Sequence, residues 1–203
     1  MLVSAVGILW LGPIRSVLAA VSVQGIALGG IAALLGVHAH DITLVATAGI
    51  VVGTKGIVVP AILRRLAGSD ILSRDLRPVV NVPASLIAAA TLAFVAFATT
   101  RNLVPLVTGP GGALLPVGFA TVLVGFFVLI ARRKPVFQMI GILLIDNGVA
   151  SIAFLLSAGV PFLIEMGVSL DVLLGVVVLV ALGSRLRDQH GDLDLDALQE
   201  LHD

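Results

Sequence analysis

The amino-acid sequence predicts an all-helical integral membrane protein with about seven transmembrane spans. Of its 203 residues, 59% are hydrophobic and only 12% are charged, whereas a soluble domain is about 45–50% apolar and about 25% charged. So little polar surface cannot cover a water-soluble particle. In lipid, the spans must be helices or a closed barrel, because every backbone polar group needs a partner. Barrel strands alternate apolar and polar residues, but the apolar runs here are continuous and about twenty residues long, which predicts helices.

The apolar runs divide the chain into seven expected spans. These are residues 2–14, 16–37, 42–63, 82–100, 113–131, 136–158 and 162–184. The first run is too short for a full crossing at about 1.5 Å per residue. We expect it either to tilt beside thinned lipid or to lack its natural first residues. A cleaved signal peptide is disfavoured, since no cation precedes the run and Arg15 follows it.

The cations fall at alternate junctions between the spans. These junctions hold Arg15, then Arg64, Arg65, Arg74 and Arg77, then Arg132, Arg133 and Lys134, then Arg185 and Arg187. That is 10 of the 12 Lys and Arg residues, while the opposite junctions hold only Arg101. Because cytoplasmic loops carry the excess of Lys and Arg, this pattern predicts an N-terminus outside and a C-terminus in the cytoplasm.

The expected domain organisation is a transmembrane helical domain over residues 1–187 and an acidic cytoplasmic tail over residues 188–203. The cytoplasmic loop at residues 64–81 is too polar to cross, and it could form a short amphipathic helix at the membrane surface. Leucines in the tail could dock on a partner, or the tail could simply be solvated. Glycine pairs at helix-packing spacing, Gly25 with Gly29 and Gly49 with Gly53, indicate close packing of helices.

The composition argues against a cofactor in this chain. It has no Cys, so it can form neither a disulfide nor a cysteine-ligated iron–sulfur cluster. We expect its four His residues to fall in loops or the tail, where none could bind a haem within the membrane. Nothing in the sequence resembles a nucleophile with its base, a phosphate-binding loop, a metal site or a basic patch for nucleic acid. We therefore expect no active site and no metal of its own.

Four ionisable residues fall inside the expected spans. Lys55 lies in GTKGIVVP, Asp146 lies almost at the midpoint of the sixth span, and Glu165 and Asp171 lie in the outer half of the seventh. A charge at the centre of a membrane helix costs about 2.5–3.5 kcal/mol on insertion scales, so such groups usually pair, face water or carry ions. These four residues are therefore the candidate functional residues.

Each of the four also has a structural interpretation. Asp146 could form a silent ion pair with Lys55, and the long stem of Lys55 could reach partly toward the membrane surface. Glu165 could be solvated or cap its helix. Asp171 follows Glu165 by six residues and so faces another direction. The chemistry that fits a functional role is proton transfer, because burial raises the pKa of a carboxyl group and lowers that of a lysine ammonium.

Two segments carry a resemblance to a known family. GTKGIVVPAI is followed much later by IDNGVA, PFLIEMGVSLDVLLGVVVLVAL and a tail containing HGDLDLDALQEL. In this order they resemble component E of hydrogenase-4, a membrane subunit of group 4 hydrogenases and formate hydrogenlyase-type complexes. The resemblance spans most of the chain and is strongest after Gln138. Lys55, Asn147, Gly148, Glu165 and Asp171 match family motifs, whereas Asp146 stands where the family usually has Glu.

The resemblance implies a role without catalysis. The C-terminal spans of that family are similar to the small K-type membrane protein of complex I and to its counterpart in multisubunit sodium/proton antiporters. It implies a chain in the prokaryotic cytoplasmic membrane, among antiporter-like subunits, whose buried ionisable residues join a lateral axis for protons or electrostatic coupling. Nickel–iron and iron–sulfur centres would lie in partner subunits. The alternatives are a subunit of a cation/proton antiporter without a redox module, a stand-alone transporter and a membrane assembly scaffold.

Overall fold

The computed structural model describes residues 1–10, 14–67, 80–107, 111–132 and 135–157. Over these ranges the chain is helical and contains no strand. Its helices are α1 (Leu2–Trp10), α2 (Ile14–Ala39), α3 (Ile42–Val51), the π-helix η1 (Val52–Val58), α4 (Val59–Ala67), α5 (Val82–Thr100), α6 (Leu115–Ala131) and α7 (Pro135–Ser157), with short 3₁₀ turns η3 (Val104–Leu106) and η4 (Gly112–Leu114) before α6. The predicted all-helical fold class is confirmed for the described residues.

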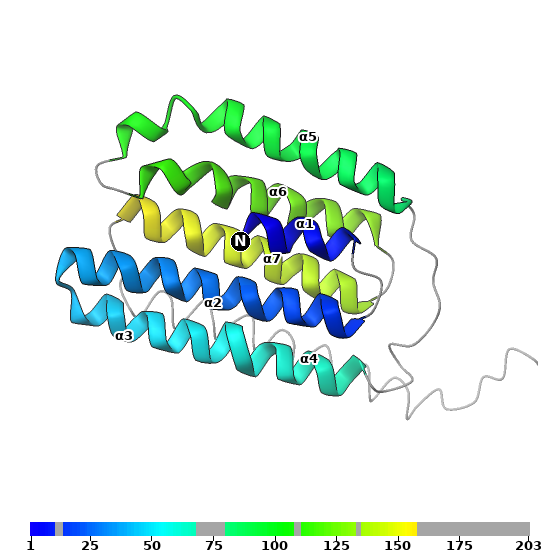
Figure 1. The fold of residues 1–203 in the computed structure, drawn as a ribbon, viewed down its shortest axis with the longest axis horizontal. Coiled ribbons are helices and arrows are strands. Elements are labelled where there is room, and N and C mark those ends of the chain that lie inside the picture. Colours follow the sequence, from blue (N-terminus) through cyan, green and yellow to red (C-terminus); the bar gives the residue numbers. More distant parts are fainter. Residues whose placement is uncertain (11–13, 68–79, 108–110, 133–134, 158–203) are drawn as a thin grey trace, which may run out of the picture.

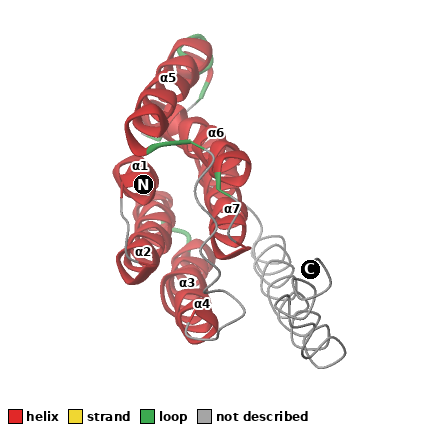
Figure 2. Cartoon of the chain, turned by 90° about the vertical axis from the view of Figure 1, so that its right-hand side faces the viewer, coloured by secondary structure: helices red, strands yellow, loops and turns green. Residues whose placement is uncertain are grey.

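The long helices lie side by side and run along the same axis (Figure 1). Seen along that axis, α5 covers α1 and α6 at one end of the bundle, α2 and α7 form its centre, and α3 with α4 covers the other end (Figure 2). The most extensive contacts join α6 to α7, α2 to α3, and α5 to α6. This order places the middle of α2 and α7 beside the junction between α3 and α4.

Five segments are long and apolar enough to cross a membrane: Ile14–Ala39, Ile42–Arg65, Val82–Thr100, Gly112–Ala131 and Phe137–Leu156. They match the second to sixth predicted spans. The described part of the first predicted span is the nine-residue helix α1, about 14 Å long, against about 30 Å of hydrocarbon. Residues 11–13 of that predicted span lie outside the described residues. The seventh predicted span and the acidic tail lie outside the described residues.

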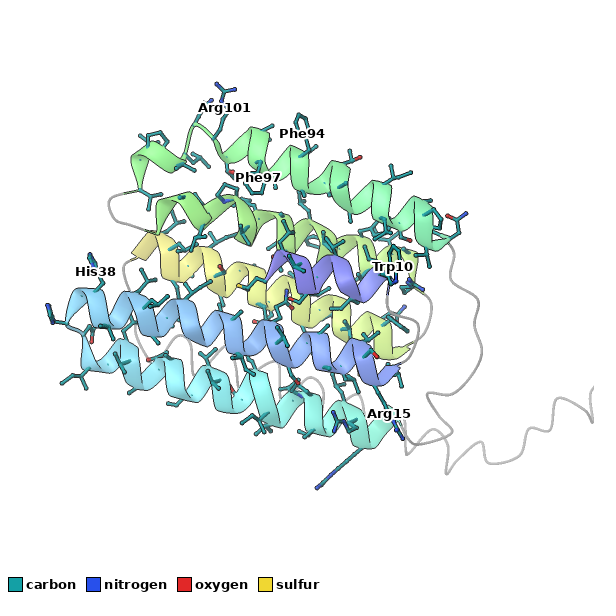
Figure 3. The ribbon with its side chains drawn as sticks, in the orientation of Figure 1. Trp10, Arg15, His38, Phe94, Phe97 and Arg101 are labelled. Atoms are coloured by element: carbon teal, nitrogen blue, oxygen red, sulfur yellow. The ribbon has the colours of Figure 1, made fainter. Side chains whose placement is uncertain are left out.

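The described cations at the predicted cytoplasmic junctions gather at one end of the bundle. Arg15 lies where α2 begins, at the end opposite His38 and Arg101 (Figure 3). Because successive long helices are antiparallel, the end of α4 and the end of α6 return to the Arg15 side, where Arg65 and Arg132 lie. The helix α4 continues to Ala67, so residues 64–67 belong to a helix and not to the predicted loop; residues 68–79 lie outside the described ranges.

Residues at this end also hold the short first helix. The Nη2 atom of Arg132 donates a hydrogen bond of 2.9 Å to the carbonyl oxygen of Leu9, in the last turn of α1. The same guanidinium lies over the ring of Phe137, 5.3 Å from its centroid, where a cation is attracted to the aromatic face. Arg132 therefore joins α1 to the α6–α7 junction. Its hydrogen bond satisfies the carbonyl group of Leu9, one of the carbonyl groups at the end of α1 that have no partner within the helix.

A tight turn joins α2 to α3 at the opposite end. His40 adopts a positive φ of 54°, a conformation that ends many helices, and the backbone N–H of Asp41 donates to the carbonyl of Gly36. The Asp41 carboxylate then accepts hydrogen bonds from the backbone N–H groups of Thr43 and Leu44 at 2.8 and 3.2 Å. This carboxylate caps α3. His38 belongs to the last turn of α2, and the expectation that it lies in a loop is wrong.

Glycines set the closest approaches between helices. A Cβ atom added at Gly25 would lie 2.5 Å from the carbonyl carbon of Lys55, and one at Gly29 would lie 2.4 Å from a methyl group of Val52. This pair packs as predicted, and it presses α2 against η1. Gly49 and Gly53 have no neighbour within 4 Å of the same position among the described residues, so no described helix packs closely on them and the packing predicted for them stays a prediction. They share a helix with Val52, on faces that no described helix covers.

The two kinds of glycine give a matched test of this packing. Gly25→Ala should destabilise the protein by about 1–3 kcal/mol, because the added methyl group overpacks a backbone contact. Gly49→Ala should be neutral or slightly stabilising, because it reduces the flexibility of the unfolded chain at an open site. Thermal unfolding in detergent measures both variants. Equal melting temperatures for the two would contradict the close approach of α2 and η1.

Candidate functional site

Lys55 lies on the π-helical segment η1, in the middle of one long helix. The segment from Ile42 to Ala67 is continuous, and Lys55 is 13 residues from its first residue and 12 from its last. Pro60 has no N–H and cannot donate the regular bond to Gly56, and just before it the N–H of Val59 donates to the carbonyl of Thr54, five residues back. Single π-turns of this kind interrupt α-helices and are frequent at functional sites.

The wide turn directs two residues of η1 into the bundle. Lys55 and Gly56 are its buried members. Gly56 packs on α2, where a Cβ atom would lie 3.0 Å from a side-chain carbon of Ile26. Glycine at this position lets the backbone of η1 lie directly on α2. The side chain of Lys55 can then extend within the bundle instead of along its surface.

Lys55 and Asp146 form a buried ion pair. The Nζ atom of Lys55 lies 2.9 Å from the Oδ2 atom of Asp146, and the two side chains are only 4% and 8% exposed. Asp146 is 11 residues from each end of α7, so the predicted central position is confirmed. The interpretation in which Lys55 reaches toward the membrane surface is wrong, because its side chain is buried and turned to Asp146. The pair joins η1 to α7 at the centre of the bundle.

A pair of amide side chains lies in the same central layer. Asn147 follows Asp146 on α7, and its Nδ2 atom donates a hydrogen bond of 3.4 Å to Oε1 of Gln24, on α2. Gln24 is fully buried and Asn147 nearly so. Gln24 precedes Gly25, which touches the backbone of Lys55. The ion pair and the amide pair therefore form one polar cluster that links η1, α7 and α2.

The glycine after Asn147 fixes the position of this cluster. A Cβ atom at Gly148 would lie 2.6 Å from a methyl group of Val122 and 2.9 Å from the carbonyl oxygen of Gly118, on α6. The sequence motif IDNG thus combines a carboxylate, an amide and a helix contact. Its Gly holds α7 against α6, and its Asp and Asn are then held toward η1 and α2. Sequence reasoning identified the residues of this motif but did not identify their separate functions.

The buried pair has a large electrostatic consequence. An isolated charge is very costly to bury, whereas two opposite charges in contact compensate each other. At 2.9 Å the ammonium and the carboxylate are also close enough for a proton to pass directly between them. The same geometry serves a structural ion pair and a proton-exchange site. Replacing only one of the two residues by a neutral residue should therefore destabilise the protein much more than replacing both.

The other predicted site residues have different outcomes. Glu165 and Asp171 lie outside the described residues, so their predicted positions remain predictions. Gln24 was not predicted, although it is a buried polar residue in a predicted span. Its signal was present in the run SVQGIALGG, as an amide directly before a packing glycine. In the described part of the chain, no three His, Asp or Glu side chains gather as a metal would require.

The described residues form an all-helical bundle with five helices long and apolar enough to cross a membrane, and with an ion pair buried at its centre. In sequence the chain is 40% identical over 204 residues to the uncharacterized protein Rv0085 of Mycobacterium tuberculosis, and the match covers 100% of this chain and 93% of that protein. The chain belongs to the same family as that mycobacterial protein. No protein-family model matches the chain. No solved structure matches it either.

Proposed function

We propose that this chain is a non-catalytic membrane subunit of a hydrogenase-4-like, complex I-related assembly, in which the Lys55–Asp146 pair exchanges protons along a lateral coupling axis. The observation that carries the proposal is the ion pair itself, 2.9 Å long and buried at the centre of two membrane helices. Intramembrane ionisable pairs of this kind are typical of proton relays. The motifs TK…VP and DNG supply the resemblance, and they contribute three residues to this one cluster.

The proposed topology has seven spans, with the N-terminus outside and the C-terminus in the cytoplasm of a prokaryotic cell. Five apolar helices support it, and so do Arg15, Arg65 and Arg132 at one end of the bundle. The bacterial source of the 40% identical relative supports the cytoplasmic membrane as the location. In this orientation the Arg15 end of the bundle faces the cytoplasm, as the positive-inside rule requires.

In the proposed mechanism, Asp146 is the central proton-exchanging group and Lys55 tunes it. A proton that moves from the Lys55 ammonium to the Asp146 carboxylate leaves two neutral groups, and its return restores the ion pair. A change of charge in a neighbouring protein favours one form over the other, which couples this site to distant chemistry. Glu165 and Asp171 extend the path toward the outer surface.

Copurification tests the assembly directly. We expect a tagged chain, extracted in a gentle detergent, to bring with it antiporter-like membrane subunits and the large and small subunits of a hydrogenase. Antiporter subunits alone would replace the proposal by a cation/proton antiporter without a redox module. A chain that purifies alone and moves a solute in liposomes would be a stand-alone transporter.

A structural scaffold is the second candidate function, and one observation favours it. The ion pair is closed and ties η1 to α7, so it could serve only to hold these helices together. A scaffold predicts that the assembled complex still works when Lys55 and Asp146 are replaced together by neutral residues. The proton-exchange proposal predicts that the same complex assembles but does not translocate protons.

A further inference from the structure

We infer that Gln24 and Asn147 bind one water molecule in the middle of the membrane bundle. The two side chains belong to α2 and α7, and they share a single hydrogen bond of 3.4 Å. That distance is longer than the usual 2.7–3.2 Å of an N–H···O bond. In the described part of the chain, the buried Nε2 atom of Gln24 and the buried Oδ1 atom of Asn147 have no hydrogen-bond partner. The hydrogen-bonded pair therefore leaves one buried donor and one buried acceptor.

This arrangement is independent of how the amide groups are oriented. An amide has one oxygen acceptor and one NH₂ donor, and the two ends exchange places when the group is turned over. Turning over both Gln24 and Asn147 reverses the direction of their hydrogen bond, and again leaves one donor and one acceptor. Turning over only one would place two like atoms against each other. A bare cation would meet the donor and an anion would meet the acceptor, but water can satisfy both.

Close contacts between helices lie next to both amides. Gly25, the neighbour of Gln24, lies so close to η1 that an added Cβ would be 2.6 Å from the carbonyl oxygen of Lys55. Gly148, the neighbour of Asn147, lies so close to α6 that an added Cβ would be 2.8 Å from the backbone nitrogen of Val122. The backbone next to each amide is thus packed directly on another helix. A buried polar group left unpaired is costly, and a buried water with two or more polar partners is the usual remedy.

The water would continue the polar cluster from the ion pair to α2. Asp146 and Asn147 are neighbours on α7, and Gln24 lies beside the backbone of Lys55 through Gly25. A water between the amides would add a group that can carry a proton beside Asn147, the residue that follows Asp146 on α7. This proton-carrying role rests on the proposed function, whereas the binding of the water does not.

A structure of the lipid-embedded protein at better than about 2 Å resolution tests the site. In the wild type we expect density for one water within about 3.2 Å of both amides. In Gln24→Leu that density should be lost while other buried waters remain. A wild-type map that resolves buried waters elsewhere but has none here would overturn the inference. So would two direct bonds between the amides, or a side chain or lipid in place of the water.

A double-mutant cycle gives a second measurement that does not depend on crystals. Gln24→Leu and Asn147→Leu should each lower the melting temperature by about 6 °C, because each leaves the other amide buried without partners. The double variant should recover most of that loss, since replacing both partners of a buried hydrogen-bonded pair by apolar side chains can be nearly neutral. Additive losses would contradict a shared site.

The outcomes also separate this inference from the proposed function. If a map shows the water and Asp146→Asn translocates protons normally, the water site is supported and the proton relay is contradicted. If Asp146→Asn loses proton translocation and the map shows no density between the amides, the proton relay is supported and the water site is contradicted.

Discussion

Lys55→Met should destabilise the protein by about 3–5 kcal/mol, because it leaves the Asp146 carboxylate buried without its counter-ion. The two side chains are 4% and 8% exposed, so water cannot replace the lost partner without opening the bundle. For a domain of this size the loss corresponds to a melting temperature about 6–20 °C lower. Thermal unfolding in detergent, at neutral pH, measures it.

Two further variants show whether this loss belongs to the ion pair. Lys55→Met combined with Asp146→Leu should recover most of the stability, since replacing both buried charges with apolar side chains is often neutral or stabilising. Arg65→Met removes an exposed cation from α4 and should change stability by less than about 0.5 kcal/mol. A double variant no more stable than Lys55→Met would show that the two residues do not act on each other.

Asp146→Asn should slow redox turnover of the assembled complex by at least about tenfold, because the amide cannot accept and release a proton at any ordinary pH. Asparagine has nearly the same shape as aspartate, and its Oδ1 atom can still accept a hydrogen bond from Lys55, but the Lys55 ammonium then lacks its counter-ion and the variant should be less stable. Turnover is therefore compared at a temperature at which the variant still copurifies with its partners. Asp146→Glu restores a carboxylate one methylene longer and should keep much of the activity. Hydrogen-linked electron transfer by purified complexes measures all three chains.

An activity equal to wild type in Asp146→Asn would show that turnover does not need a titratable group at this position. Equal losses in Asp146→Asn and Asp146→Glu would instead assign the effect to packing around α7. A variant chain that no longer copurifies with its partners would mark the change as a failure of assembly, and the scaffold function would then be favoured.

The sequence predicted the five long described helices and the buried charges of two of them, Lys55 and Asp146, correctly, because both depend on local composition. Continuous apolar runs define the five long helices, and a charge in the middle of such a run is visible wherever it occurs. The central position of Asp146 follows directly from counting along its run. The gathering of Arg15, Arg65 and Arg132 at one end of the bundle follows from the alternation of cations between the spans.

Other features depend on which helix faces share a contact, and one sequence does not determine that. Gly25 and Gly49 lie in similar small-residue patterns, yet only Gly25 meets a neighbouring backbone among the described residues. Gln24 and Asn147 are 123 positions apart, and a neutral amide is far less conspicuous than a charge in an apolar run. The π-helix around Lys55 is also hidden, because its glycines and Pro60 are common in ordinary membrane helices.

The central claim is that the Lys55–Asp146 pair moves protons, and one measurement tests it most directly. Protons translocated per turnover can be followed in membrane vesicles that contain the assembled complex, with Asp146→Asn compared to wild type. We expect the variant chain to assemble into the complex. We expect the residual redox turnover of that complex to be accompanied by essentially no proton translocation. A wild-type ratio of protons to turnovers in Asp146→Asn would contradict it, and would leave the ion pair as a structural link between η1 and α7.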